Sequence, residues 1–339
     1  MPGRPRPQVV ILAPEPLFRS FFDTPRLRRM GRSFRWRREG ARQSTPALRR
    51  AVADADALVT TWDTPFLDER LLVCAPRARI VGHCGGEVKA LFAPALFDRL
   101  VITNAQGPMA RYVAELAVTF LLYSARNVDA YRTELRRPDN AIYRRLHRDG
   151  AGAETILGRT VGLLGFGKIG RAVADLLRPF GVRLLVHDPH VSAAAVREHG
   201  AWPASWPELL SRSRHLILAA ALTEKTRNLL DARAFARMPD GATLINVARG
   251  GLVDQDALTR EVRSGRLRCA LDVTDPAEPL PLRHPLRRAR GAIVTPHVGA
   301  APREVRHHMA ATVLSDLESF FGGRPVANRV TLDMLRRMT

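Results

Sequence analysis

The chain has 339 residues, of which 46% are hydrophobic, and its formal net charge at pH 7 is +20. This length favours two domains over one. No apolar run approaches the ~20 residues of a transmembrane helix, and the apolar patch at 9–13 is too short for a signal peptide. Cys74, Cys84 and Cys269 show no CxxC spacing, which indicates a reducing compartment and neither a disulfide framework nor a zinc site. We therefore expect a cytoplasmic protein without a bound metal.

The positive charge is an excess of arginine, because only three of the 53 basic residues are lysines. A nucleic-acid-binding surface has no physical reason to exclude lysine, whereas a GC-rich coding sequence favours arginine. The densest basic run is RLRRMGRSFRWRR, residues 26–38. It is either a nucleic-acid or phosphate patch or a solvated, arginine-rich edge, and we favour the edge. We expect no nucleic-acid partner and no membrane partner.

Short apolar runs alternate with helical patterns along the chain, which is typical of α/β folds with parallel sheets. In the first third we predict strands at 8–13, 57–60, 79–83 and 100–103, and helices at 45–55 and 87–100. The apolar periodicity from Arg111 to about Arg137 predicts a long helix that crosses between domains or lines a dimer interface. Residues 138–157 are expected to form a loop.

The second half is more regular and fits successive βαβ units. Its strands are predicted to begin near Val161, Leu184, Leu216, Thr243, Arg268 and Ala292. A last helix is predicted from Ala301 to about Phe321. We expect this helix to return to the first domain, which makes that domain discontinuous.

Gly165, Gly167 and Gly170 form a GxGxxG motif between an apolar strand and a helical pattern, the context that a dinucleotide-binding turn requires. The first glycine permits a tight turn, the second lets a pyrophosphate approach the backbone, and the third lets helix and strand pack closely. The helix N-terminus then offers free N–H groups to the phosphates. Asp188 ends the next strand, where a carboxylate accepts hydrogen bonds from ribose hydroxyls and repels a 2′-phosphate. We therefore predict NAD as the cofactor, in preference to NADP.

Reactive side chains follow several later strands of the second half. Arg249 follows the strand TLINV, Asp272 follows CAL with Glu278 shortly after it, and His297 follows AIVT. Ligands of parallel sheets collect beyond the carboxyl ends of the strands, so these groups are expected to converge with the glycine turn.

The chemistry of a 2-oxo acid assigns roles to three of these side chains. Reduction of the carbonyl by hydride needs a proton donor, and His297 suits this role. Glu278 can hold the imidazole and favour its protonated form. Arg249 can clamp a carboxylate and polarise the adjacent carbonyl.

As a set, the motifs of the second half resemble the D-2-hydroxyacid dehydrogenase family, which includes phosphoglycerate, glyoxylate/hydroxypyruvate and formate dehydrogenases. The resemblance covers most of 155–300 and rests on GFGKIG, HDP, LTEKTRNLL, MPDGATLINVARGGLVDQDAL, ALDVTDPAEPLP and TPHVGA. It implies that Arg249, Glu278 and His297 are the catalytic residues, that Asp188 binds ribose and that Asp272 binds the nicotinamide amide. The predicted cofactor-binding residues are Gly165, Phe166, Gly167, Lys168, Ile169, Gly170, Asp188, Ala220, Ala221, Val247, Ala248, Asp272 and His297.

The first half resembles the family more thinly, through HCGGEVKA and RYVAELAV. The resemblance implies that Gly85, Gly86 and Glu87 bind the substrate carboxylate together with Arg249 and His297. It also implies two Rossmann-like domains, each a doubly wound parallel sheet, and a homodimer. The substrate-binding domain would comprise 1–105 and the C-terminal return 300–339, and the NAD-binding domain 106–299 would be inserted into it.

The chain departs from the family pattern at three places. DVTDPAEP holds one more residue before the glutamate than is usual in the family, so Asp275 stays a rival of Glu278 as the partner of His297. Ala219 and Ala221 stand where family members commonly have His and Pro. Glu87 introduces an acid into the substrate loop, so either it points away or the substrate carries a group that binds it.

The residues leave several functions open. The first is an NAD-dependent dehydrogenase or reductase of a small D-2-hydroxy or 2-oxo acid, acting on CH–OH donors. The second is an NAD(H)-sensing binding protein similar to the C-terminal-binding corepressors that the family resemblance includes, and a third is oxidation of a phosphorus oxyacid by the same fold. The intact set of arginine, glutamate and histidine favours the dehydrogenase. The sequence does not identify the acid, and the many arginines keep phosphorylated and dicarboxylic acids open.

Overall fold

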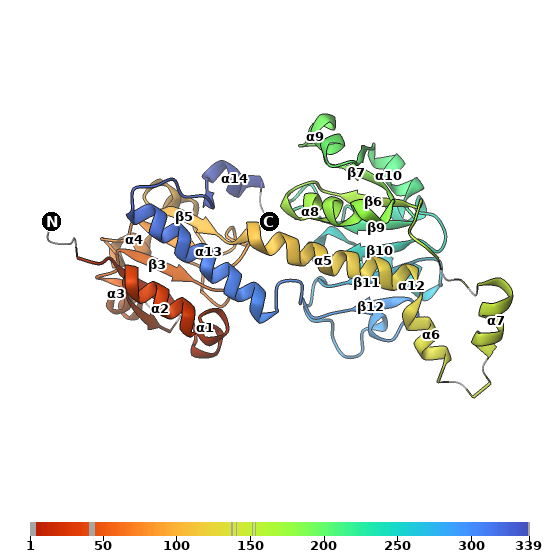
Figure 1. Ribbon diagram of the computed structural model, residues 1–339, viewed down its shortest axis with the longest axis horizontal. Helices are drawn as coiled ribbons and strands as arrows, with labels where there is room; N and C mark the ends of the chain where they lie inside the picture. Colours follow the sequence, from red (N-terminus) through yellow and green to blue (C-terminus); the bar gives the residue numbers. More distant parts are fainter. Residues whose placement is uncertain are drawn as a thin grey trace. The chain divides into compact units, whose positions relative to one another are not determined.

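The computed structural model in Figure 1 describes residues 5–40, 45–136, 138, 139, 141–150, 152 and 154–337. Its contacts divide the chain into two compact units, the first formed by Met1–Met109 with Ala300–Thr339 and the second by Ala110–Gly299. The sequence analysis set the first boundary after residue 105. Each unit contains one mainly parallel sheet with its own helices, which is the predicted α/β architecture.

The first unit is built on a six-stranded sheet in the order β13-β5-β4-β3-β1-β2, in which only β13 is antiparallel. The strands are β1 (Gln8–Leu12), β2 (Arg35–Glu39), β3 (Ala57–Thr60), β4 (Ile80–His83), β5 (Val101–Asn104) and β13 (Arg329–Val330). The predicted strands β1, β3, β4 and β5 are present. We did not predict β2, because its sequence RWRRE is nearly all charged, as an edge strand tolerates.

The helices of the first unit are α1 (Glu15–Phe21), α2 (Thr24–Ser33), α3 (Thr45–Val52), α4 (Arg70–Cys74), η1 (Pro94–Asp98), α13 (Arg303–Phe321) and α14 (Leu332–Arg337). The returning helix α13 buries Met309, Val313 and Leu317, whose spacing places them on one face. A Cβ on Gly82 of β4 would lie 2.4 Å from Val313, so a glycine there allows the close approach of α13 to the sheet. The helix predicted at 301–321 is therefore confirmed.

The second unit is built on a seven-stranded, fully parallel sheet in the order β12-β11-β10-β9-β6-β7-β8. The strands are β6 (Thr160–Leu164), β7 (Arg183–His187), β8 (Trp202–Pro203), β9 (His215–Leu218), β10 (Thr243–Asn246), β11 (Arg268–Leu271) and β12 (Ala292–Val294). Its helices are α5 (Gln106–Ala125, continuing from the first unit), α6 (Val128–Glu134), α7 (Ala141–Asp149), α8 (Lys168–Leu177), η2 (Arg178–Phe180), α9 (Ala193–Glu198), α10 (Trp206–Arg212), α11 (Ala232–Ala236), η3 (Gly250–Leu252), α12 (Gln255–Arg263) and η4 (Pro285–Arg287).

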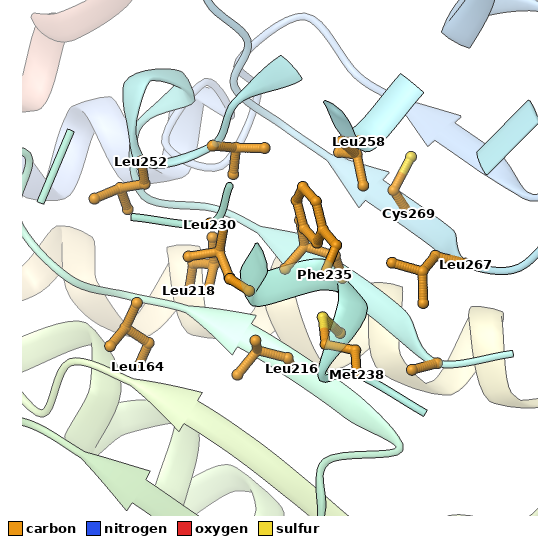
Figure 2. Packing of buried hydrophobic residues seen from close by; sticks show 14 of the residues in the cluster. Leu164, Leu216, Leu218, Leu230, Phe235, Met238, Leu252, Leu258, Leu267 and Cys269 are labelled. Carbon is orange, nitrogen blue, oxygen red and sulfur yellow. The ribbon is translucent and has the colours of Figure 1, made fainter. Parts of the chain in front are cut away.

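The apolar core of the second unit lies between the sheet and its helices. Figure 2 shows Phe235 of α11 beside Leu216 and Leu218 of β9, and all three are fully buried. Fixing the strands in this way also fixes their carboxyl ends, where the candidate site lies.

Three predicted segments were wrong. Residues 87–100 form turns and the short η1 instead of a helix, because Phe92 pairs with Leu67 in a β-bridge and Pro94 interrupts a helix. The helix predicted over 111–137 begins at Gln106 and ends at Ala125, and the left-handed Asn127 (φ 53°) separates it from α6. The predicted loop 138–157 contains α7, whose Ile142 and Leu146 lie one turn apart among arginines and a tyrosine.

The expectations about membrane-spanning helices and about disulfides can be compared with the described part of the chain. None of its helices is long and apolar enough to cross a membrane. The three cysteines are buried and form no disulfide.

Candidate active site

The glycine turn joins β6 to α8 at the carboxyl edge of the second sheet. Gly165 has φ +92°, and a Cβ there would lie 2.6 Å from the backbone N of Ala220, so the turn packs directly against the end of β9. A Cβ on Gly170 would lie 2.3 Å from the carbonyl oxygen of Gly165. Gly167 is different, because a Cβ there would have no neighbour within 4 Å. Two glycines therefore serve packing, and the middle one leaves open space at the start of α8.

The start of α8 is suited to bind an anion. Its N-cap residue, Gly167, supplies no side-chain hydrogen bond to the first turn. The N–H groups of Lys168, Ile169 and Gly170 belong to that turn, where backbone donors and the helix dipole favour a phosphate. The open space at Gly167 and these donors fit the pyrophosphate of a dinucleotide.

Asp188 follows β7 and ties the glycine turn to the neighbouring strand. Its Oδ2 accepts a hydrogen bond of 2.7 Å from the N–H of Phe166, and its Oδ1 accepts one of 2.9 Å from the N–H of His190. Each carboxylate oxygen has a second lone pair for a ribose hydroxyl. The ring of Phe166 is fully buried beside His199, so only its backbone faces the turn.

The turn after β10 is shaped by Asn246, which we did not predict. Its side chain donates to the carbonyl of Arg249 (2.9 Å) and accepts from the N–H of Ala248 (3.0 Å). A Cβ on Gly250 would lie 2.2 Å from the backbone of Thr274, so this turn is in backbone contact with the loop after β11. The guanidinium of Arg249 is half-buried and donates to the carbonyl of Ala248. The signal for Asn246 was available, since an amide side chain ends an apolar strand.

Asp272 organises the loop that carries His297. Its carboxylate, in a residue only 2% exposed, accepts hydrogen bonds from Thr295 Oγ1 (2.5 Å), the N–H of Val298 (2.7 Å) and the N–H of Gly299 (2.9 Å). Its carbonyl also accepts the N–H of His297. His297 has φ +57°, a conformation that is uncommon for a non-glycine residue and that these bonds hold in place.

His297 and Glu278 lie in contact. Nδ1 of His297 is 3.2 Å from Oε1 of Glu278, and their side chains are 49% and 36% exposed. Asp275, the rival acid, instead has Oδ2 3.8 Å from Nη1 of Arg227. The structure thus brings the imidazole to Glu278.

The remaining predicted cofactor residues line the same edge. Ala220 and Ala221 follow β9 and are half-buried, and Val247 and Ala248 follow β10 and are buried. Thr226 Oγ1 donates to the carbonyl of Ala221 (2.8 Å). These four residues therefore present apolar side chains at the ends of the two strands.

The predicted substrate loop belongs to the first unit and follows β4. Oε1 of Glu87 accepts the N–H groups of Lys89 (2.8 Å) and Ala90 (3.2 Å), so this carboxylate folds back onto its own turn. The carbonyls of Gly85 and Gly86 accept hydrogen bonds from Ala105 and Asn104. Within the described residues, the N–H groups of these two glycines have no partner, as a site for a carboxylate requires.

His83 lies directly before this loop and is buried. Burial lowers the pKa of its imidazole to about 3, so the ring is neutral at pH 7. Its Nδ1 lies 2.9 Å from Thr60 Oγ1, and a Cβ on Gly85 would come within 2.4 Å of the ring. His83 therefore supports the loop backbone as a neutral group. Among the described residues, no cluster of histidine, cysteine or carboxylate side chains could hold a metal ion.

Comparison with known proteins identifies the family and the fold. Residues 118–299 match the family model of the D-isomer specific 2-hydroxyacid dehydrogenase, NAD binding domain. The chain belongs to this family. The family, the fold of two parallel sheets and NAD as the cofactor are thereby confirmed as predicted from the sequence.

Individual members of the D-2-hydroxyacid dehydrogenase family match most of the chain. It is 32% identical over 287 residues to the D-3-phosphoglycerate dehydrogenase of Mycobacterium leprae, covering 84% of this chain and 52% of that protein. It is 30% identical over 308 residues to the glyoxylate reductase of Korarchaeum cryptofilum, covering 89% and 90%. A crystal structure of a phosphoglycerate oxidoreductase from Rhizobium etli superimposes with a TM-score of 0.80 at 27% identity, covering 96% and 98%. The chain spans about half the length of the phosphoglycerate dehydrogenases that it matches.

Proposed function

We propose that the protein transfers a hydride between NAD(H) and a small D-2-hydroxy or 2-oxo acid. The observation that carries this proposal is the contact of His297 with Glu278 at the edge of the sheet that also bears the glycine turn. A binding protein needs the glycine turn alone. A histidine held by a carboxylate is the additional feature that proton transfer requires.

His297 is the proposed acid and base. Because Glu278 lies at Nδ1, that nitrogen carries a proton, and Nε2 is the atom that gives a proton to the substrate oxygen in reduction and removes it in oxidation. The side chain is half-exposed, so a substrate can reach it. The left-handed backbone of His297, held by Asp272, fixes the direction of the ring.

Arg249 is the proposed anchor of the substrate carboxylate. A guanidinium binds a carboxylate with two parallel hydrogen bonds and favours negative charge on the adjacent oxygen. Asn246 fixes the backbone from which Arg249 extends. In the first unit, Gly85, Gly86 and Glu87 are the proposed substrate residues, with the two glycines donating N–H groups to the carboxylate.

The proposed cofactor contacts follow from the turn and the strand ends. The first turn of α8 holds the pyrophosphate, and Asp188 holds the ribose hydroxyls, which favours NAD over NADP. Ala220, Ala221, Val247 and Ala248 line the nicotinamide side. Asp272 retains one lone-pair site for the nicotinamide amide beyond its three hydrogen bonds. When bound, NADH supplies the hydride.

Several further assignments belong to this proposal. Residues 1–105 and 300–339 form the substrate-binding domain, and 106–299 form the NAD-binding domain. The protein forms a homodimer and acts in the cytoplasm on a small-molecule acid, without a nucleic-acid or membrane partner.

The test is a panel of 2-oxo acids and phosphorus oxyacids, followed by NAD(H) absorbance. The panel includes short, hydroxylated, dicarboxylic and phosphorylated 2-oxo acids. We expect turnover of at least one 2-oxo acid, and His297→Ala should lower kcat by ~10²–10⁴-fold. NADH affinity should change less than about twofold, because the cofactor is held by the glycine turn and Asp188. Tight NADH binding without turnover of any acid would contradict the proposal and support a sensing role.

A further inference from the structure

A cavity of about 750 Å³ lies at the opposite edge of the first unit's sheet from the Gly85–Glu87 loop. Its lining residues precede the strands or lie at the ends of helices α2 and α13. They are Pro5, Arg6, Pro7, Arg29, Arg32, Ser33, Phe34, Asp56, Arg77, Arg79, Glu318, Phe321 and Arg324. Substrate and cofactor of a parallel α/β fold collect at the carboxyl edge. This cavity therefore needs a separate explanation.

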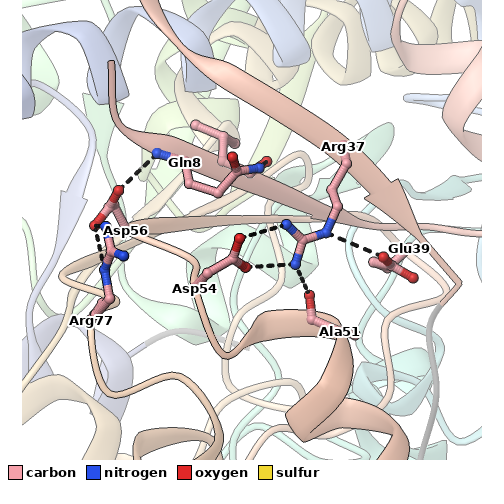
Figure 3. A network of polar contacts seen from close by, with 8 residues as sticks. Gln8, Arg37, Glu39, Ala51, Asp54, Asp56 and Arg77 are labelled. Carbon is pink, nitrogen blue, oxygen red and sulfur yellow. Dashed lines mark hydrogen bonds and ion pairs between the residues drawn. The ribbon is translucent and has the colours of Figure 1, made fainter. Parts of the chain in front are cut away.

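The cavity is strongly basic, since six arginines and only two carboxylates line it. Both carboxylates are already paired. The carboxylate of Glu318 accepts hydrogen bonds from Nε (3.0 Å) and Nη2 (2.6 Å) of Arg29. The carboxylate of Asp56 accepts hydrogen bonds from Nη2 of Arg77 (2.8 Å) and from the backbone N–H of Gln8 (2.8 Å), as Figure 3 shows.

The other four arginines carry the excess charge. Arg79 is held over the rings of Phe320 and Phe321, with its guanidinium carbon 5.5 and 5.1 Å from their centroids. Arg6 donates to a backbone carbonyl. Arg32 and Arg324 are exposed, and their side chains form no ion pair with any carboxylate of the described residues. Four cations without an acid partner among the described residues thus surround one hollow, and their combined field attracts an anion.

The basic run 26–38 contributes to this cavity through Arg29, Arg32, Ser33 and Phe34. Several other arginines of the run are paired with acids of their own unit. Arg26 binds Asp23, Arg38 binds Glu15, and Arg37 binds Asp54 and Glu39 (Figure 3). The run is thus no continuous stripe of unpaired charge for a nucleic-acid backbone, and Arg32 is the exposed arginine that it brings to the hollow without an acid partner among the described residues.

We propose that this cavity binds a small anion with two or more phosphoryl groups. Guanidinium groups bind phosphoryl oxygens with paired hydrogen bonds, and several of them around one hollow match several phosphoryl groups. Arg29, Arg77 and Arg79 are held in position by Glu318, Asp56 and the two phenylalanine rings, so little side-chain freedom is lost on binding. This site is separate from the proposed dehydrogenase site and does not depend on it.

Isothermal titration calorimetry with inorganic tripolyphosphate tests the proposal. The protein is the full chain in 150 mM salt with saturating NADH, so that the glycine turn is not the site measured. We expect saturable binding of one tripolyphosphate per chain and weaker binding of inorganic phosphate. The double variant Arg32→Gln/Arg324→Gln should lose at least about tenfold in affinity, which corresponds to about 1.4 kcal/mol.

The matched control is Arg28→Gln/Arg99→Gln, which removes the same charge from exposed positions of the same unit outside the cavity. It should bind tripolyphosphate within about twofold of wild type, and both double variants should keep wild-type NADH affinity. Equal affinity in wild type and Arg32→Gln/Arg324→Gln, or equal loss in both double variants, would overturn the proposal. A DNA duplex that binds more tightly than tripolyphosphate and depends on Arg32 and Arg324 would overturn the small-ligand assignment.

Discussion

Nδ1 of His297 lies 3.2 Å from Oε1 of Glu278, whereas the carboxylate of Asp275 lies 3.8 Å from Nη1 of Arg227. The extra residue in DVTDPAEP therefore does not move Glu278 away from the imidazole. Within this loop, Thr274 Oγ1 donates to the carbonyl of Ala277 (2.7 Å). The N–H of Asp275 donates to the side chain of Gln255 on α12 (3.1 Å), which directs the first acid elsewhere.

Replacing these two acids should have different effects on the pH profile. Glu278→Gln removes the negative charge that favours the imidazolium, so the pH optimum for reduction should move down and kcat at neutral pH should fall at least about tenfold. Asp275→Asn should leave the optimum where it is. Steady-state kinetics from pH 5 to 9 measures both. A shift in Asp275→Asn with none in Glu278→Gln would reverse the assignment.

Asp272 should act as a positioning residue for His297. Asp272→Asn keeps the size of the side chain but replaces one acceptor oxygen by a donor, so it cannot accept the bonds from Thr295, Val298 and Gly299 together. We expect kcat to fall at least about tenfold, with a smaller change in KM, because the ring of His297 loses its fixed direction. Thr295→Ser keeps the hydroxyl and should restore most of the activity lost in Thr295→Ala. Equal activity of these two Thr295 variants would exclude this role for the hydroxyl.

The sequence was most informative where a motif fixes both conformation and chemistry. The glycine turn, Asp188, Arg249 and His297 were found because parallel strands bring their carboxyl ends to one edge. The sequence assigned Glu278 but kept Asp275 as a rival, because the choice between the two acids depends on how a loop folds.

The sequence analysis missed elements that are rich in charged residues and roles that depend on hydrogen bonds within the folded chain. The strand β2 and the helix α7 are rich in arginine, and apolar periodicity is the signal on which prediction relies. Asn246 and Asp272 stabilise loops through hydrogen bonds to backbone groups that are distant along the chain or inside a turn. The position of Asn246 at the end of an apolar strand is visible in the sequence, but the partners of these hydrogen bonds leave no pattern there.

Asp188 should determine the cofactor preference. Asp188→Asn keeps one acceptor oxygen but removes the charge that repels a 2′-phosphate. We expect NADH to bind about tenfold more weakly and the preference for NADH over NADPH to narrow. Fluorescence titration with both cofactors measures the effect, and Asp175→Asn on the exposed face of α8 is the control. NADPH binding as tightly as NADH to the wild-type protein would contradict the role of Asp188.

The predicted homodimer has a candidate surface on α6 and α7. Phe120 of α5, inside the segment 111–137 predicted to line a dimer interface, is buried in the core and only 5% exposed. Leu135, directly after α6, and Tyr143 of α7 are 65% and 60% exposed, so a partner subunit can cover both. Light scattering should give twice the chain mass of 37.6 kDa. Leu135→Asp should shift the protein toward monomer, and Val73→Asp on α4, at an equally exposed site, should not.

A last prediction concerns acid stability and His215, the first residue of β9. Its side chain is fully buried, and neither ring nitrogen has a hydrogen-bond partner within the described residues. Burial, with a smaller contribution from the charges of Arg268 and Arg214, lowers the pKa of His215 to about 4, although Glu154 acts in the opposite direction. Unfolded chains bind a proton on this ring below pH 6.5, whereas the folded chain binds it only below about pH 4.

Since the unfolded state binds more protons between pH 6.5 and 4, His215 should make the folded state less stable as the pH falls through this window. At pH 5 the loss relative to pH 8 is about 2 kcal/mol. His215→Leu has no group to protonate, so the free energy of unfolding of the second unit should decrease less between pH 8 and pH 5 than in wild type. Urea unfolding at the two pH values measures this difference. His147→Gln, on the exposed α7, should behave like wild type, and an unchanged pH dependence in His215→Leu would rule out His215 as the acid-sensitive group.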